Sequence, residues 1–262
     1  MNEVLIIALV GLAAALASVA GLVLMRRLVP TQRLADHPEV TGALYGITGA
    51  MYSVLLAFVV IAAWDDYRDA HAAVTNEATS VRNLARITSG WPAADRAPVE
   101  AALIAYAHHV VDVEWPAMAR GDLGPVTSPV SVNQLWQALD QANEAAATKS
   151  ASYAAAMTQF NALGQARDQR GLLAQERLPL SMRLILFIGA AVTIAFSCVL
   201  VIDAGRLHVL MTASLAALIA LLLLLQYQLA RPFQGVVAIE PTAMALVLAE
   251  IDTETNPPGI SP

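Results

Sequence analysis

GALYGITGAMYSVLLAFVVIAAW, residues 42–64, is the stretch that decides the fold of this chain. It has no charged residue and exceeds the roughly 20 apolar residues needed to cross a bilayer. Along one side, small residues recur at three- and four-residue intervals: Gly42, Gly46, Gly49 and Ser53. Each glycine would cost a helix in water roughly 1 kcal/mol, whereas in lipid small residues let helix backbones approach closely. We therefore expect a central membrane helix whose packing side is formed by these four residues.

The rest of the chain also has the composition of a membrane protein. Of its 262 residues, 57% are hydrophobic and only 14% are charged, whereas about a quarter of the residues are charged in soluble domains. The apolar residues are concentrated in four runs without Asp, Glu, Lys or Arg, each about as long as a membrane span: 4–25, 40–64, 184–202 and 207–230. We therefore expect an all-α protein with four transmembrane helices.

A polar segment, residues 65–182, separates the second and third spans. Apolar residues recur in it at three- and four-residue intervals, which is the periodicity of amphipathic helices. The first of these stripes follows directly on the second span, so we expect that span to continue as one long helix as far as Ser89-Gly90. We expect the whole segment to form a helical bundle inserted between the second and third spans, outside the membrane.

This pattern divides the chain into four parts. Residues 1–64 hold transmembrane helices 1 and 2, residues 65–182 form the bundle, and residues 183–231 hold transmembrane helices 3 and 4. Residues 232–262 are expected to form a short amphipathic helix followed by a disordered tail.

Charge and motif content exclude several functions. The net charge of −6, without any cluster of Lys and Arg, argues against nucleic acid as a partner. Cys198 is the only cysteine, so neither an internal disulfide nor a zinc-finger spacing is possible. The sequence contains no nucleotide-binding loop, hydrolase elbow or HExxH motif. Its spans have no internal Asp, Glu, Lys or Arg of the kind that coupled transporters carry. We expect no cofactor and no enzymatic activity.

One short stretch has a spacing that can hold a metal. His108 and Asp112 share a helix face at i,i+4. Transition-metal sites, however, need ligands that converge from several elements and an ordered surrounding shell. We therefore expect a solvated or hydrogen-bonded face of the bundle here, and no metal.

The second span also offers residues that could line a pore. Val54, Phe58 and Ala62 run at fourfold spacing, and Tyr45 and Tyr52 lie seven residues apart. In a symmetric oligomer such side chains form rings, and apolar rings gate channels by dewetting. Ordinary packing between helices is the alternative interpretation of the same residues.

Acidic residues follow directly on this span. Asp65, Asp66 and Asp69 would form a collar of negative charge at the mouth of a pore, and such a collar favours cations. The alternative is a solvated acidic cap on an ordinary helix.

The charges on the short loops leave the orientation in the membrane open. The arginines after the first span indicate that the short loops are cytoplasmic, whereas the arginines flanking the last two spans indicate the reverse. We expect a multi-pass protein of the bacterial inner membrane.

Several short motifs are similar to those of a known family. The longer motifs are Gly42-Ala-Leu-Tyr45-Gly46, Glu114-Trp115-Pro116-Ala-Met118 and Arg231-Pro232-Phe233-Gln-Gly235. The shorter ones are Asn76-Glu77-Ala78, Tyr106 and Arg170. In these motifs, which are spread over nearly the whole chain, the sequence resembles a bestrophin-like group of bacterial and plant membrane proteins.

A more distant resemblance connects the chain with the bestrophins proper. Those are pentameric anion channels with four membrane helices and a large cytosolic helical part between the second and third. The resemblance implies that the bundle and both termini are cytoplasmic. It also implies a pore neck in the second membrane helix, where Val54, Phe58 and Ala62 are the nearest matches. This chain departs from bestrophins because its second span has no proline, has a single phenylalanine, and is not accompanied by an acidic calcium clasp.

Together these features predict a homo-oligomeric ion channel whose pore is lined by the second span, with the selectivity left open. The expected partners are the lipid bilayer, other copies of the chain and inorganic ions, and a pentamer is the assembly that the resemblance implies. The alternative is a non-conducting scaffold or sensor whose bundle binds a protein partner. The apolar stripes of the bundle helices and the lack of reactive groups favour this alternative.

Overall fold

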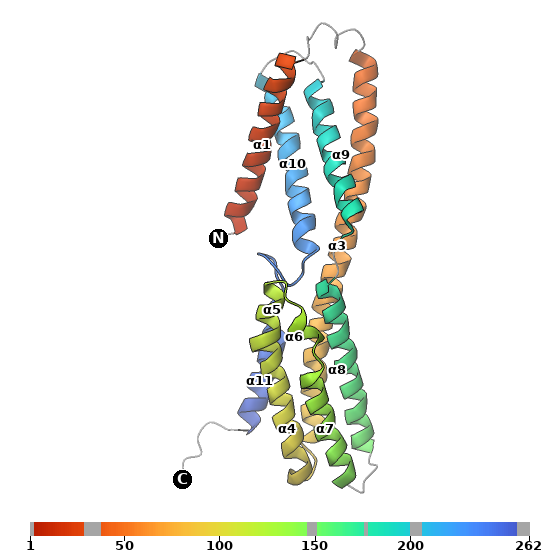
Figure 1. The fold of residues 1–262 in the computed structure, drawn as a ribbon, viewed down its shortest axis with the longest axis vertical. Helices are drawn as coiled ribbons and strands as arrows, with labels where there is room; N and C mark the ends of the chain where they lie inside the picture. Colours follow the sequence, from red (N-terminus) through yellow and green to blue (C-terminus); the bar gives the residue numbers. More distant parts are fainter. Residues whose placement is uncertain (1–2, 29–37, 146–150, 176–177, 200–205, 256–262) are drawn as a thin grey trace. The chain divides into compact units, whose positions relative to one another are not determined.

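The computed structural model describes residues 3–28, 38–145, 151–175, 178–199 and 206–255. Within these ranges every regular element is helical, as the all-α prediction requires. The chain separates into two compact units (Figure 1). We call residues 1–65 and 177–230 the membrane unit, and residues 66–176 and 231–262 the bundle unit.

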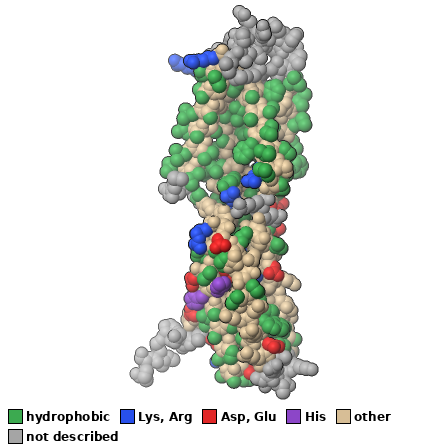
Figure 2. All heavy atoms as spheres, in the orientation of Figure 1, with side chains coloured by type: hydrophobic (Ala, Val, Ile, Leu, Met, Phe, Trp, Pro, Cys, Tyr) green, Lys and Arg blue, Asp and Glu red, His purple; other side chains and the backbone are tan. Residues whose placement is uncertain are grey.

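The membrane unit is built from the apolar helices. They are α1 (Glu3–Leu28), the first part of α3 (Pro38–Thr88), α9 (Leu180–Val199) and α10 (Arg206–Leu229). In the described part of the chain, these four helices are long and apolar enough to cross a membrane, which confirms the predicted four spans. Figure 2 shows hydrophobic side chains over most of the visible face of this unit. Such a surface suits lipid as the solvent.

The core of the membrane unit joins α3 to α9 and α10. Tyr52, Leu56 and Val59 of α3 are buried against Leu186 and Ala190 of α9 and Ile219 of α10. The buried α3 residues are three and four apart, so they occupy one side of the helix. That side points toward the other helices of the same chain.

Gly189 is a point of close approach in this core. A Cβ placed on Gly189 would lie 2.5 Å from Cδ2 and 2.7 Å from Cε2 of the Tyr52 ring, which is closer than carbon atoms can approach. Glycine at this position therefore lets the tyrosine ring lie directly on the α9 backbone.

We predict that Gly189→Ala lowers the stability of the protein in detergent by about 1–3 kcal/mol, because the core becomes overpacked. Gly164→Ala in α8 is the control, since a Cβ at Gly164 meets no atom within 4 Å, and it should be neutral or stabilising by up to about 1 kcal/mol. Thermal unfolding followed by circular dichroism measures both. Equal melting temperatures for the two variants would contradict the packing described here.

The second span continues without a break into the bundle unit. α3 is one helix from Pro38 to Thr88, as its stripe predicted. It ends where Ser89-Gly90 form a turn, with the Ser89 N–H donating to Ala85 O at 2.9 Å. The same helix thus supplies residues to both units.

The bundle unit is formed by the second part of α3 and shorter helices. These are α4 (Ala93–His108), the π-helix η1 (His109–Glu114), α5 (Trp115–Ala119), α6 (Gly124–Thr127), α7 (Val130–Ala145), α8 (Ala151–Gln175) and α11 (Thr242–Thr255). Its core contains apolar residues of several of these helices, with Val81, Leu103, Leu139 and Leu163 all buried. Met244 and Val247 of α11 join the same core, so the C-terminal helix packs as part of the bundle.

Candidate functional site

The side of α3 opposite its buried residues is open in the membrane unit. Phe58 is 68% exposed, and Met51, Val54 and Ile61 are also more than half exposed. Ala62 is exposed as well. The predicted lining residues Val54, Phe58 and Ala62 therefore share an apolar face that the described helices of the membrane unit leave uncovered.

The two tyrosines of the predicted lining lie in different surroundings. Tyr45 is half-buried. Tyr52 is only 6% exposed and packs on Gly189 in the core of the membrane unit. This position differs from the expected one, because the ring packs against another helix of the same subunit. Tyr52 is therefore left out of the lining proposed below.

The small residues of α3 lie beside a groove. Gly46, Gly49 and Ser53 line it together with α10 residues such as Leu218 and Leu222, around a volume of about 540 Å³. No atom lies within 4 Å of a Cβ placed on Gly42, Gly46 or Gly49. The Ser53 hydroxyl donates to Gly49 O at 2.7 Å, within its own helix. This side of α3 therefore has the room and the apolar surface that a helix of another copy would need.

The predicted acidic residues are at the surface. Asp65, Asp66 and Asp69 are all exposed on α3. Their carboxylates are thus accessible to ions in solution.

A second candidate site is a group of charged side chains buried in the bundle unit. Arg170 of α8 is fully buried and donates through Nε to Glu77 Oε2 at 2.6 Å and through Nη2 to Glu77 Oε1 at 2.9 Å. The same Nη2 donates to Glu114 Oε2 at 2.6 Å. A buried charge is stable only when it is paired and hydrogen-bonded, and this arginine satisfies two carboxylates from two different helices.

Arg167 and Tyr106 complete this buried network. Arg167 Nη1 forms an ion pair with Glu114 Oε1 at 2.6 Å, and its Nη2 donates to Val126 O and Ser128 O. The Tyr106 hydroxyl donates to Glu77 Oε1 at 2.5 Å. Burial, together with the Glu77 carboxylate, raises the pKa of Tyr106 well above its ordinary value of 10.0, so the phenol stays protonated and remains a donor.

The carboxylates also hold the arginines in their charged form. Burial acts to lower the pKa of Arg170, but the neighbouring Glu77 and Glu114 carboxylates outweigh it and raise that pKa above its ordinary value. The guanidinium of Arg170 lies over the Trp115 ring, 5.3 Å from its centroid. The two arginines and two glutamates balance in charge, which makes the cluster a neutral buried network.

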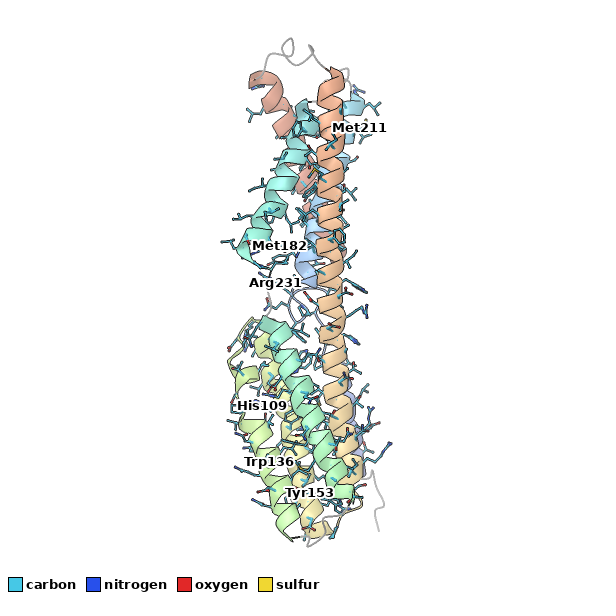
Figure 3. All side chains as sticks on the ribbon, turned by 90° about the vertical axis from the view of Figure 1, so that its right-hand side faces the viewer. His109, Trp136, Tyr153, Met182, Met211 and Arg231 are labelled. Carbon is cyan, nitrogen blue, oxygen red and sulfur yellow. The ribbon has the colours of Figure 1, made fainter. Side chains whose placement is uncertain are left out.

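The π-helix places Glu114 inside the bundle. η1 lies between α4 and α5, and a π-turn takes up one residue more than an α-turn. Val110 and Glu114 are its buried residues. His109, labelled in Figure 3, begins this segment, and its Nε2 lies 3.5 Å from Glu114 Oε1.

The predicted metal-spacing pair forms only a local contact. His108 Nδ1 and Asp112 Oδ2 are 3.0 Å apart, and both side chains are more than half exposed. Among the described residues, no group of three or more His, Cys, Asp and Glu side chains could hold a metal ion. The pair lies on the solvated face that was expected.

The segment after α10 closes over the same region of the bundle unit. Trp115 Nε1 donates to Ile239 O at 2.9 Å, and the Trp115 ring packs edge-on against Phe233 at 5.8 Å. Gly235 has φ of +84°, a conformation that glycine adopts without strain. The Glu114-Trp115 motif and the Arg231–Gly235 motif therefore meet in space.

The buried network was not predicted, although the sequence contains a signal for it. Glu77 interrupts the apolar stripe of α3 between Val74 and Val81, and Arg167 and Arg170 continue the stripe of α8 that includes Phe160 and Leu163. Opposite charges at core positions of two helices indicate a buried ion pair, because an unpaired charge there would be too costly.

In the described residues, four helices long and apolar enough to cross a membrane are combined with a helical bundle, as in an all-α, multi-pass membrane protein. The chain belongs to the Bestrophin-like family, since the model of the Bestrophin-like domain matches residues 12–244. The match confirms the resemblance seen in the short motifs. Among curated proteins, none matches the chain by sequence.

Solved structures with the same fold include a bacterial bestrophin homologue from Klebsiella pneumoniae. One variant of it has a TM-score of 0.75 at 15% identity, covering 95% of this chain and 99% of that chain. A second structure, obtained by zinc phasing, has a TM-score of 0.72 at 15% identity and covers 96% of this chain and 98% of that chain. At this level of identity the similarity shows a shared fold, and function has to be argued from the site.

Proposed function

We propose that this chain assembles into a homo-oligomer and conducts ions along a path lined by the exposed face of α3, with Val54, Phe58 and Ala62 as the narrow apolar part. The observation that carries this proposal is the division of α3 into two faces. One packs inside the subunit, and the opposite one is apolar and open. The likeness to bestrophins, whose pore neck lies in the second membrane helix, supports the same assignment.

The small side of α3 would provide the contact between copies. Gly46, Gly49 and Ser53 lie beside an unfilled groove, and small residues at this spacing are typical of close helix contacts in lipid. In a ring of copies, the packed face of each α3 would contact its own subunit, the small side a neighbour, and the open face the central axis. We infer a closed ring, and a pentamer follows from the bestrophin likeness.

Two features of the chain predict opposite ion selectivities. The exposed Asp65, Asp66 and Asp69 would attract cations, whereas the bestrophin likeness implies anions. The reversal potential in a salt gradient distinguishes the two. We place the protein in the bacterial inner membrane, with its bundle and termini on the cytoplasmic side as in bestrophins.

We predict that the purified protein conducts ions in planar bilayers and that Phe58→Ala raises the current severalfold, because removing an apolar ring makes the constriction easier to wet. Phe187→Ala on α9 is the matched control, since Phe187 is similarly exposed at 62%, and it should leave the current unchanged. The absence of current from both the wild type and Phe58→Ala would remove the proposal. A stable monomer or dimer would instead favour a scaffold or sensor, because neither can close a ring.

A further inference from the structure

An apolar groove lies in the membrane unit between α1, α9 and α10. Small residues from all three helices line it, among them Ala14, Ser18 and Gly21 on α1, Ala191 on α9 and Ala220 on α10. Their short side chains leave a volume of about 440 Å³. The groove is distinct from the one beside Gly46 and Gly49, which is lined mainly by α3 and α10.

The lining of this groove does not suit water. A stable buried water needs two to four polar partners. The Ser18 hydroxyl donates to Ala15 O at 2.8 Å, within its own helix, and the remaining lining consists of apolar side chains and the thiol of Cys198. An unfilled groove would also lose dispersion contacts along its walls. Hydrocarbon is therefore the favoured occupant at this depth of the membrane.

The size of the groove fits an acyl chain. A volume of about 440 Å³ has room for on the order of 15 groups of the size of a water molecule, which is comparable to the methylenes of one fatty acyl chain.

Positive charge lies at the end of the membrane unit toward which the groove extends. α1 ends and α10 begins at this end (Figure 1). Arg27 and Arg206 are both exposed there. Gly21 in the groove precedes Arg27 by about 9 Å along the helix axis, and Cys198 lies one residue before the end of α9. Basic side chains between membrane helices bind the headgroups of anionic lipids.

We propose that this groove holds one acyl chain of an anionic phospholipid whose phosphate lies against Arg27 and Arg206. The assignment rests on the apolar lining, the volume and the charge at one end. It does not depend on whether the protein conducts ions.

Cys198 provides a direct reporter, because it is the only cysteine of the chain and lines the groove. The full-length protein is reconstituted in vesicles of phosphatidylglycerol or of phosphatidylcholine, and alkylation of Cys198 by N-ethylmaleimide is followed by mass spectrometry. Native mass spectrometry counts the lipids that remain bound after extraction. We expect alkylation to be severalfold slower in phosphatidylglycerol, and we expect phosphatidylglycerol to be retained in preference to phosphatidylcholine.

Two variants and their controls separate the parts of the site. The double variant Arg27→Gln/Arg206→Gln should abolish the preference for phosphatidylglycerol, whereas Arg183→Gln, at the opposite end of α9, should keep it. Ala220→Phe should fill the groove and reduce lipid retention, whereas Ala8→Phe, outside the groove, should not. Equal alkylation and equal retention with both lipids would overturn the proposal. So would protection of Cys198 that follows assembly of the chain regardless of the lipid, since a second copy would then cover the groove.

Discussion

Arg170→Ala is expected to destabilise the bundle unit by about 3–5 kcal/mol, the cost of removing one partner from a buried ion pair. The substitution leaves the Glu77 and Glu114 carboxylates buried without the donor that satisfies both of them. It also removes the contact of the guanidinium with the Trp115 ring. Urea unfolding of the full-length protein in detergent, followed by circular dichroism, measures the loss.

Arg82→Ala is the matched control for this prediction. Arg82 also forms an ion pair, with Glu250 at 2.6 Å, but both side chains are substantially exposed. Exposed pairs contribute only about 0–1 kcal/mol because water and salt screen them. A similar loss of stability for Arg82→Ala and Arg170→Ala would contradict the buried network.

The double variant Glu77→Gln/Glu114→Gln tests the same network from the other side. It leaves Arg170 with neutral partners, so it should also destabilise the bundle unit, while Asp112→Asn at the exposed His108 contact should not. Comparing the free energies of unfolding of these variants shows whether the buried carboxylates and Arg170 are paired with one another rather than solvated.

The fold could be predicted from the sequence because its signals are strong and local. Uncharged runs of membrane length and three-to-four periodicity lead directly to α1, α9, α10 and the amphipathic helices of the bundle. The continuation of the second span to Thr88 followed from the stripe that begins at Val74. The end of α3 was predicted closely for the same reason, since Ser89-Gly90 follows its last residue, Thr88.

The arrangement of side chains could be predicted only in part. The three-to-four periodicity indicated that each bundle helix has one apolar side, but periodicity alone gives no means of choosing which helices face one another. The Glu77 to Arg170 contact joins residues far apart in the chain, and the π-helix that turns Glu114 inward changes the helical register that sequence analysis assumes. Tyr52 shows the same limit, because the glycine that accommodates its ring is on another helix.

The proposed function rests on the open face of α3, and modification of cysteines placed on this face is expected to have the second large effect. Val54→Cys and Phe58→Cys, each in a Cys198→Ser background, should lose most of their current when a charged, water-soluble thiol reagent is added. The reagent can reach a thiol that lines an aqueous path, and the added charge and bulk then obstruct that path. A thiol that faces lipid is inaccessible to the same reagent.

Bilayer recording of these variants before and after the reagent, with Phe187→Cys on α9 as the control, is the most direct test of whether α3 lines the path. We predict that the currents of Val54→Cys and Phe58→Cys are blocked and that the current of Phe187→Cys is unchanged. Unmodified currents at both α3 positions, or a block only at Phe187→Cys, would contradict it.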